Sequence, residues 1–141
     1  MASYGSGIQF LKNRWLRILQ GPDLRATRGI GYADLVGAGG TVAQQDDKIA
    51  GVTLNTSNGL ITMNNAAMGA DEVVSFTLTN NRIQDTDFIM LQHNSTGTVG
   101  AYILSAQPAA GSAVITVANR TTGTLGEGIV LRFMRFAGAS S

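Results

Sequence analysis

The feature that most constrains the fold is a run of short apolar blocks between Gly51 and Phe136, separated by Asn, Gly, Asp and Ser. The clearest block is 74–78, where Val74, Phe76 and Leu78 alternate with Ser and Thr. A period of two places the apolar residues on one face of a strand. Such blocks, starting every ~8–14 residues with turn residues between them, are typical of a β-sandwich. The sequence therefore predicts an all-β fold, and the short connections favour antiparallel pairing.

Three local patterns give more detailed expectations. The run from Asp87 to Gln92 is apolar almost throughout, which predicts a strand buried on both faces. Asn58 and Gly59 are residues that tolerate a positive φ, which predicts a hairpin turn between two strands. Asp85 precedes the apolar run, and we expect its carboxylate to accept bonds from backbone amides in its own turn.

At 141 residues the chain has the length of a single domain. We expect residues 1–45 to form an amino-terminal arm with little regular structure, and residues 46–141 to form the sandwich. Ile8, Leu11 and Trp15 follow helical spacing, and Gly21-Pro22 would end a helix. Ile8 and Phe10 also fit an extended arm, so both readings of 8–20 stay open.

Charge is scarce and unevenly placed. Only 13% of the residues are charged, against roughly 25% in a typical globular domain. Low charge with many small residues is typical of a protein whose surface is partly covered by other proteins. A basic start on a nearly neutral body suggests a docking arm, or alternatively a solvated face. Trp15, the only Trp, is either a core residue or an anchor for a partner. The candidate partner-binding residues are Lys12, Arg14, Trp15, Arg17, Arg25 and Arg28.

The sequence predicts no enzyme and no cofactor. His93 is the only His, there is no Cys, and no Gly-x-Ser-x-Gly motif is present, so neither a catalytic triad nor a zinc site is indicated. No loop supplies the six to eight oxygens that calcium needs. The glycines lack phosphate-loop spacing. No signal-peptide pattern and no stretch of ~18 apolar residues is visible. Only the amino-terminal region, with Arg14, Trp15, Arg17 and Tyr32, comes close to the basic face interleaved with aromatic residues that nucleic-acid binding needs. We expect neither nucleic acid nor a membrane as a partner.

The chain resembles a family of small tailed-bacteriophage virion structural proteins. The resemblance extends over much of the region from Gly40 to Phe133 and lies in scaffold residues, so no functional residue is carried over. Its main segments are Gly40-Thr-Val-Ala-Gln, Gly51-Val-Thr-Leu-Asn, Ile61-Thr-Met-Asn-Asn-Ala-Ala and Val74-Ser-Phe-Thr-Leu-Thr-Asn.

The resemblance implies a jelly-roll-like capsid cement, or decoration, protein. Such a protein is made in the host bacterial cytoplasm and sits on the capsid surface of the virion, as a homotrimer that binds the major capsid protein and stabilises neighbouring capsid subunits. The alternative is a tail fibre or spike module that recognises a host surface glycan. In that case the site would be formed by the 65–71 and 93–97 loops, with Tyr102 or Tyr32 as a stacking surface.

Overall fold

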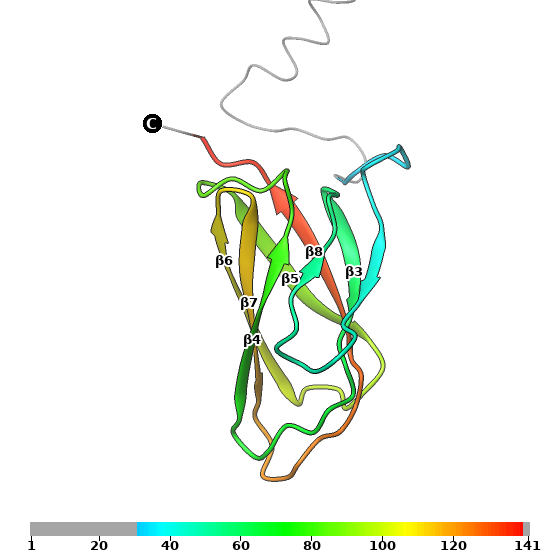
Figure 1. The fold of residues 1–141 in the computed structure, drawn as a ribbon, viewed down its shortest axis with the longest axis vertical. Helices are drawn as coiled ribbons and strands as arrows, with labels where there is room; N and C mark the ends of the chain where they lie inside the picture. Colours follow the sequence, from blue (N-terminus) through cyan, green and yellow to red (C-terminus); the bar gives the residue numbers. More distant parts are fainter. Residues whose placement is uncertain (1–30, 140–141) are drawn as a thin grey trace, which may run out of the picture. The chain divides into compact units, whose positions relative to one another are not determined.

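The computed structural model describes residues 31–139, and the strands within that range form two packed sheets (Figure 1). The strands are β1 (Thr41–Ala43), β2 (Val52–Thr53), β3 (Asn58–Thr62), β4 (Val73–Thr79), β5 (Phe88–Ser95), β6 (Tyr102–Ala109), β7 (Ser112–Asn119) and β8 (Val130–Phe136). One sheet has the order β1-β3-β8-β5 and the other β2-β4-β7-β6. The predicted all-β sandwich is confirmed. Within residues 31–139 no helix has the length and hydrophobicity needed to cross a membrane.

The expectation of purely antiparallel pairing is wrong, because both sheets are mixed. β1 pairs in parallel with β3, and β2 pairs in parallel with β4. From β1 to β5 the chain alternates between the two sheets. β1 and β3 thus become neighbours that run in the same direction, and so do β2 and β4. Short connections imply antiparallel neighbours only when consecutive strands lie in one sheet. The four remaining pairs, including β6–β7, are antiparallel.

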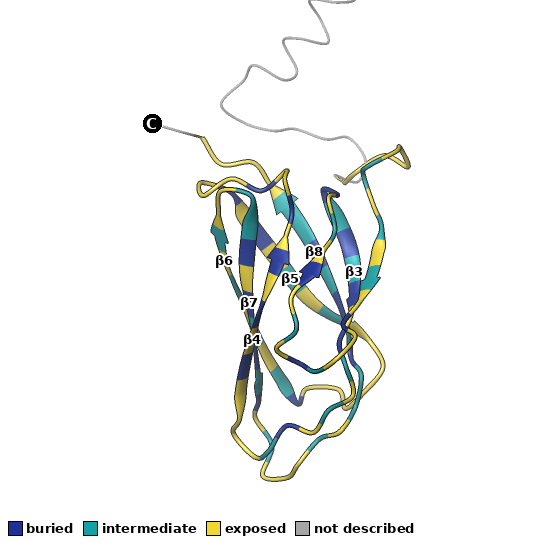
Figure 2. Ribbon diagram, in the orientation of Figure 1, coloured by how far each residue is buried: buried dark blue, intermediate teal, exposed yellow. Residues whose placement is uncertain are grey.

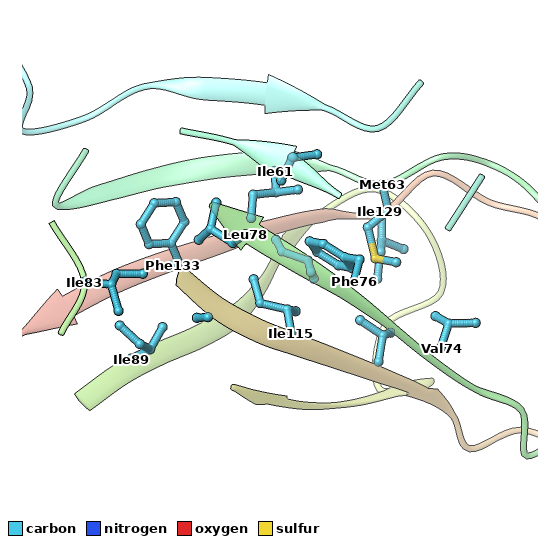
Figure 3. Packing of buried hydrophobic residues seen from close by; sticks show 14 of the residues in the cluster. Ile61, Met63, Val74, Phe76, Leu78, Ile83, Ile89, Ile115, Ile129 and Phe133 are labelled. Atoms are coloured by element: carbon cyan, nitrogen blue, oxygen red, sulfur yellow. The ribbon is translucent and has the colours of Figure 1, made fainter. Parts of the chain in front are cut away.

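The core forms where the inward residues of the two sheets meet (Figure 3). On β4 and β7 the register sets Val74 opposite Val117 and Phe76 opposite Ile115. Buried and exposed residues alternate along these strands, as Figure 2 shows. The period of two predicted for 74–78 is thus confirmed. The fully or nearly fully buried apolar residues include Ile61, Met68, Leu78, Ile83, Ile115, Val117, Ile129, Leu131 and Phe133.

Asn58 and Gly59 do not form the expected hairpin turn. Both belong to β3, and neither is among the described residues with a positive φ. β2 and β3 lie in different sheets, so no hairpin joins them. Glycine is needed at 59 for space, because a Cβ there would lie 2.6 Å from Leu54 Cδ2 and 3.0 Å from Phe133 Cε1. A residue without a side chain lets the ring of Phe133 pack against the β3 backbone.

Candidate interaction surface

The six predicted partner-binding residues lie outside the described range. Lys12, Arg14, Trp15, Arg17, Arg25 and Arg28 all precede Gly31, so their role stays a prediction. The same holds for the choice between helix and extended arm at 8–20. β1 lies within residues 1–45, which were expected to form the amino-terminal arm, and it pairs with β3 of the sandwich.

The β5–β8 pair presents exposed apolar side chains on its outer face. Phe88 and Met90 are 62% and 46% exposed, and Phe136 is 38% exposed. The register sets Phe88 opposite Phe136 and Met90 opposite Met134. The rings of Phe88 and Phe136 have their centroids 6.3 Å apart. We call Phe88, Met90, Met134 and Phe136 the β5–β8 patch. Burial of β5 on both faces, which the sequence predicted, is therefore wrong for the isolated chain, because no described element covers this face.

The outer face of the second sheet is uncharged. Its exposed apolar residues are Val73, Ile103 and Val114, and Ser75 shares a 2.8 Å hydrogen bond with Thr116. The outward positions of β4, β6 and β7 are Val73, Ser75, Thr77, Thr79, Ile103, Ser105, Gln107, Ala109, Ser112, Val114, Thr116 and Ala118. Charged side chains commonly protect a protein surface from associating with other proteins, and the strands of this face carry none.

A polar cluster joins β6 to the loops that precede β6 and β8. The carboxylate of Glu127 accepts bonds from the Tyr102 hydroxyl at 2.7 Å and from the Thr98 amide at 2.6 Å. The backbone bond from Thr98, and then the bond from Tyr102, hold the pKa of Glu127 below its ordinary value. Burial and the bond to Glu127 raise the pKa of Tyr102. His93 packs edge-on to the Tyr102 ring at 5.6 Å and bonds the Thr96 carbonyl through Nε2.

Lys48 lies buried beside this cluster. Its ammonium group donates to the carbonyl oxygens of Asn64 at 2.5 Å and Glu127 at 2.7 Å. Burial lowers the pKa of Lys48, and the charge of Glu127 opposes that effect. The carbonyl of Lys48 accepts a 3.0 Å bond from Gln44 Nε2. These contacts connect the β1–β2 loop to Asn64, which follows β3, and to Glu127, which precedes β8. The buried lysine therefore has a structural role.

Replacing Tyr102 by phenylalanine is expected to reduce the free energy of unfolding by about 1.5 kcal/mol, because a partly buried hydrogen bond to a charged acceptor is lost. Urea unfolding of the full chain measures the change. In a Glu127→Gln background the same replacement should cost clearly less, since the charged acceptor is already gone. Equal losses in both backgrounds would show that the hydroxyl and the carboxylate are not coupled.

A second polar cluster holds the start of β5. The carboxylate of Asp87 receives bonds from the guanidinium of Arg135, from the amide of Gln84 at 2.8 Å and from the amide of Gly138 at 3.2 Å. Burial acts to raise the pKa of Asp87, but these bonds outweigh it and lower that pKa. The sequence assigned such a role to Asp85, whereas Asp85 is exposed and Asp87 occupies it. The hydroxyl of Tyr32 donates to the carbonyl of Arg135.

The hydroxyl groups of the two tyrosines proposed for a glycan site are hydrogen-bonded within the protein. Tyr102 is half-buried, with its ring in a T-shaped contact with His93 and its hydroxyl bonded to Glu127. Tyr32 is more exposed, at 41%. The apolar face was missed by the sequence analysis, although the run Phe88-Ile-Met-Leu in a chain of low charge was the signal that could have revealed it.

Residues 31–139 contain no group of three or more His, Cys, Asp or Glu side chains placed to hold a metal ion. Among them no buried side-chain nitrogen or oxygen atom lacks a hydrogen-bond partner. The polar clusters thus have the character of structural supports, and the β5–β8 patch is the candidate site. No family model, curated protein or solved structure matches the chain.

Proposed function

We propose that this chain is a non-catalytic cement, or decoration, protein of a bacteriophage capsid, which binds the outer shell and bridges neighbouring capsid subunits. The observation that carries the proposal is the exposed β5–β8 patch on the β-sandwich. Phe88, Met90 and Phe136 expose apolar area that a free monomer would ordinarily bury. Aromatic and Met side chains are enriched at the centres of protein interfaces.

The distribution of charge supports the same proposal. Five basic residues and one acidic residue precede Gly31, whereas five basic and eight acidic residues follow it. The basic segment provides Arg14, Arg17, Arg25 and Arg28 to pair with acidic groups on a shell, and Trp15 to fill a pocket. Charge pairs of this kind set the orientation and rate of association, while buried aromatic residues supply most of the affinity.

Two further parts of the proposal come from the resemblance to phage structural proteins. The partner is the major capsid protein, and the chain assembles with itself, as trimers in the proteins it resembles. The rival function, a fibre or spike module for glycans, has less support, because the Tyr102 hydroxyl already donates to Glu127 and its ring contacts His93. A glycan array is expected to give no binder.

The test is the binding of purified full-length chain to capsid shells that lack it, followed by sedimentation and by the melting temperature of the shell. We expect the chain to sediment with the shells and to raise their melting temperature. The variant Arg14→Gln/Arg17→Gln/Arg25→Gln/Arg28→Gln should bind at least ~10-fold more weakly, since each lost charge pair contributes a few tenths of a kcal/mol or more. Arg120→Gln is the matched control, because Arg120 is an exposed partner of Asp71. A chain that neither binds nor stabilises shells would refute the proposal.

A further inference from the structure

The first and the last described segments of the sandwich lie at the same end of the two sheets (Figure 1). The hydroxyl of Tyr32 donates to the carbonyl of Arg135, near the end of β8. The amide of Gly138 donates at 3.2 Å to Asp87, which also pairs with Arg135. We call this the Tyr32 end, and it consists of residues 32–38, 81–87 and 136–139. The chain segment before Tyr32 therefore joins the sandwich at this end.

Backbone hydrogen bonds fix the 35–38 loop at the Tyr32 end. The carbonyl of Gly37 accepts a 3.2 Å bond from the amide of Ser57, whose carbonyl accepts a 2.9 Å bond from the amide of Arg135. Ser57 thus connects the loop to β8. Within the loop, Leu35 is 71% exposed and Val36 is fully exposed. Two large apolar side chains are therefore open to solvent at this end.

These side chains extend the exposed apolar surface of the β5–β8 patch. Phe88 begins β5 and Phe136 ends β8, so the paired rings lie where the patch reaches the Tyr32 end. Tyr32 is itself 41% exposed, and it bonds to Arg135, the residue before Phe136. The exposed apolar residues of the sheet face and those of the Tyr32 end therefore adjoin each other.

The opposite end of the sandwich is acidic. Lys48 and Thr98 both bond to Glu127. Met68 and Leu125 exchange two backbone hydrogen bonds. We call this the Glu127 end, and it consists of residues 44–50, 63–72, 96–101 and 120–128. Its five acidic residues are Asp46, Asp47, Asp71, Glu72 and Glu127, and its two basic residues are Lys48 and Arg120.

Charge, rather than apolar exposure, distinguishes the two ends. Val99 is 93% exposed at the Glu127 end, so both ends present apolar side chains. Five basic residues and one acidic residue precede Gly31, and they belong to the segment that joins the sandwich at the Tyr32 end. A negatively charged surface therefore attracts the chain on the side of the Tyr32 end and repels the Glu127 end. The Tyr32 end is itself close to neutral, with Asp34, Asp85, Asp87, Arg82 and Arg135.

We propose that the chain docks end-on, with Leu35, Val36 and Phe136 of the Tyr32 end and its border seated on an acidic, partly apolar surface of the shell protein. The Glu127 end then points away from the shell. This inference rests on the proposed capsid function and specifies which side of the chain makes the contact. The basic segment sets the orientation of the encounter, and the apolar side chains supply the buried contact area.

Cysteine footprinting measures this orientation, because the chain contains no Cys. Val36→Cys and Val99→Cys are matched variants, since each replaces a highly exposed valine and they lie at opposite ends. Each full-length variant is labelled with a maleimide reagent, free and bound to shells that lack the chain. Binding should slow the labelling of Val36→Cys about tenfold, because the reagent needs an accessible thiol. The labelling rate of Val99→Cys should not change.

The free and the bound chain are compared at equal concentration, so that protection by self-association is present in both samples. Equal protection of the two positions, or protection of Val99→Cys alone, would overturn end-on docking and leave the proposed function standing. If the unmodified chain did not bind shells, the proposed function and the docking orientation would fail together.

A pair of charge variants tests the contact by affinity. Val36→Asp should weaken binding to the shells about tenfold, because the new carboxylate faces an acidic surface and loses an apolar contact. Val99→Asp is the matched control and should bind as the unmodified chain does. Urea unfolding should show the same stability for both variants, since both positions are exposed. Equal affinity of the two variants for shells would contradict the proposed orientation.

Discussion

Replacing Phe133 by alanine is expected to reduce the free energy of unfolding by about 4 kcal/mol, within the range for buried aromatic residues. Phe133 is fully buried at the centre of β8 and packs against Gly59 on β3. Truncation removes the apolar contacts of the ring and leaves a cavity between the sheets. Because the backbone at Gly59 is held by the β3–β8 ladder, the cavity cannot close easily. Urea unfolding of the full chain at fixed concentration measures the loss.

Two companion variants test which of the aromatic side chains lie in the core. Phe133→Leu should cost less than about 1.5 kcal/mol, since it keeps most of the apolar volume. Phe88→Ala should cost about 1 kcal/mol or less, because Phe88 is 62% exposed and its ring pairs with that of Phe136 on the outer face. If the two alanine variants lost equal stability, the assignment of Phe133 to the core and Phe88 to the outer face would be wrong.

Replacing Asp87 by asparagine is expected to reduce the free energy of unfolding by about 3 kcal/mol, at the lower end of the range for breaking a buried ion pair. The carboxylate of Asp87 is almost fully buried, whereas the side chain of Arg135 keeps some exposure. The neutral amide removes the charge that holds the guanidinium and places donor hydrogens where backbone amides also donate. Asp46→Asn is the matched control, at an exposed carboxylate with no ion pair among the described residues.

The same residue predicts a pH dependence. The folded-state pKa of Asp87 is lowered from its ordinary value of 3.8. The stabilisation is therefore fully present above that ordinary value, and it is lost as the pH falls through the lower, folded-state pKa. The Asp87→Asn variant has no carboxylate to protonate, so it should not lose this stability in acid. The difference in the free energy of unfolding between the unmodified chain and the variant should therefore shrink below about pH 4. A difference that stays constant from pH 7 to pH 2.5 would contradict this origin.

The β-sandwich could be predicted because its strands follow a local rule. Val74, Phe76 and Leu78 alternate with Ser and Thr, and the inward residues of β8, Leu131 and Phe133, are separated by Arg132. Alternation of this kind depends only on the geometry of an extended chain. Sheet membership was not predictable in this way. The parallel β1–β3 and β2–β4 pairs depend on which sheet each strand joins, which no local pattern specifies.

At the candidate surface, too, the local pattern predicted the strand, whereas the position of the strand in the sheet decided which residues are exposed. Phe88 and Met90 were expected to be buried because they belong to an apolar run, and the run itself was correctly identified as a strand. Only the position of β5 at the edge of its sheet leaves them exposed. Similarly, the turn before β5 was expected to contain a capping carboxylate. The choice of Asp87 over Asp85 depends on Arg135, which is distant in sequence and adjacent in the fold.

The sequence by itself determined the all-β class, the inward face of β4 and the low charge of this protein, because each of these depends on residue type and spacing along the chain. The tertiary structure alone decided that the sheets are mixed, that Gly59 is needed for close packing and that β5 is an edge strand with exposed apolar residues. These features depend on which distant segments become neighbours. The free energy of the whole fold decides which segments become neighbours, and no short stretch of the sequence determines that free energy.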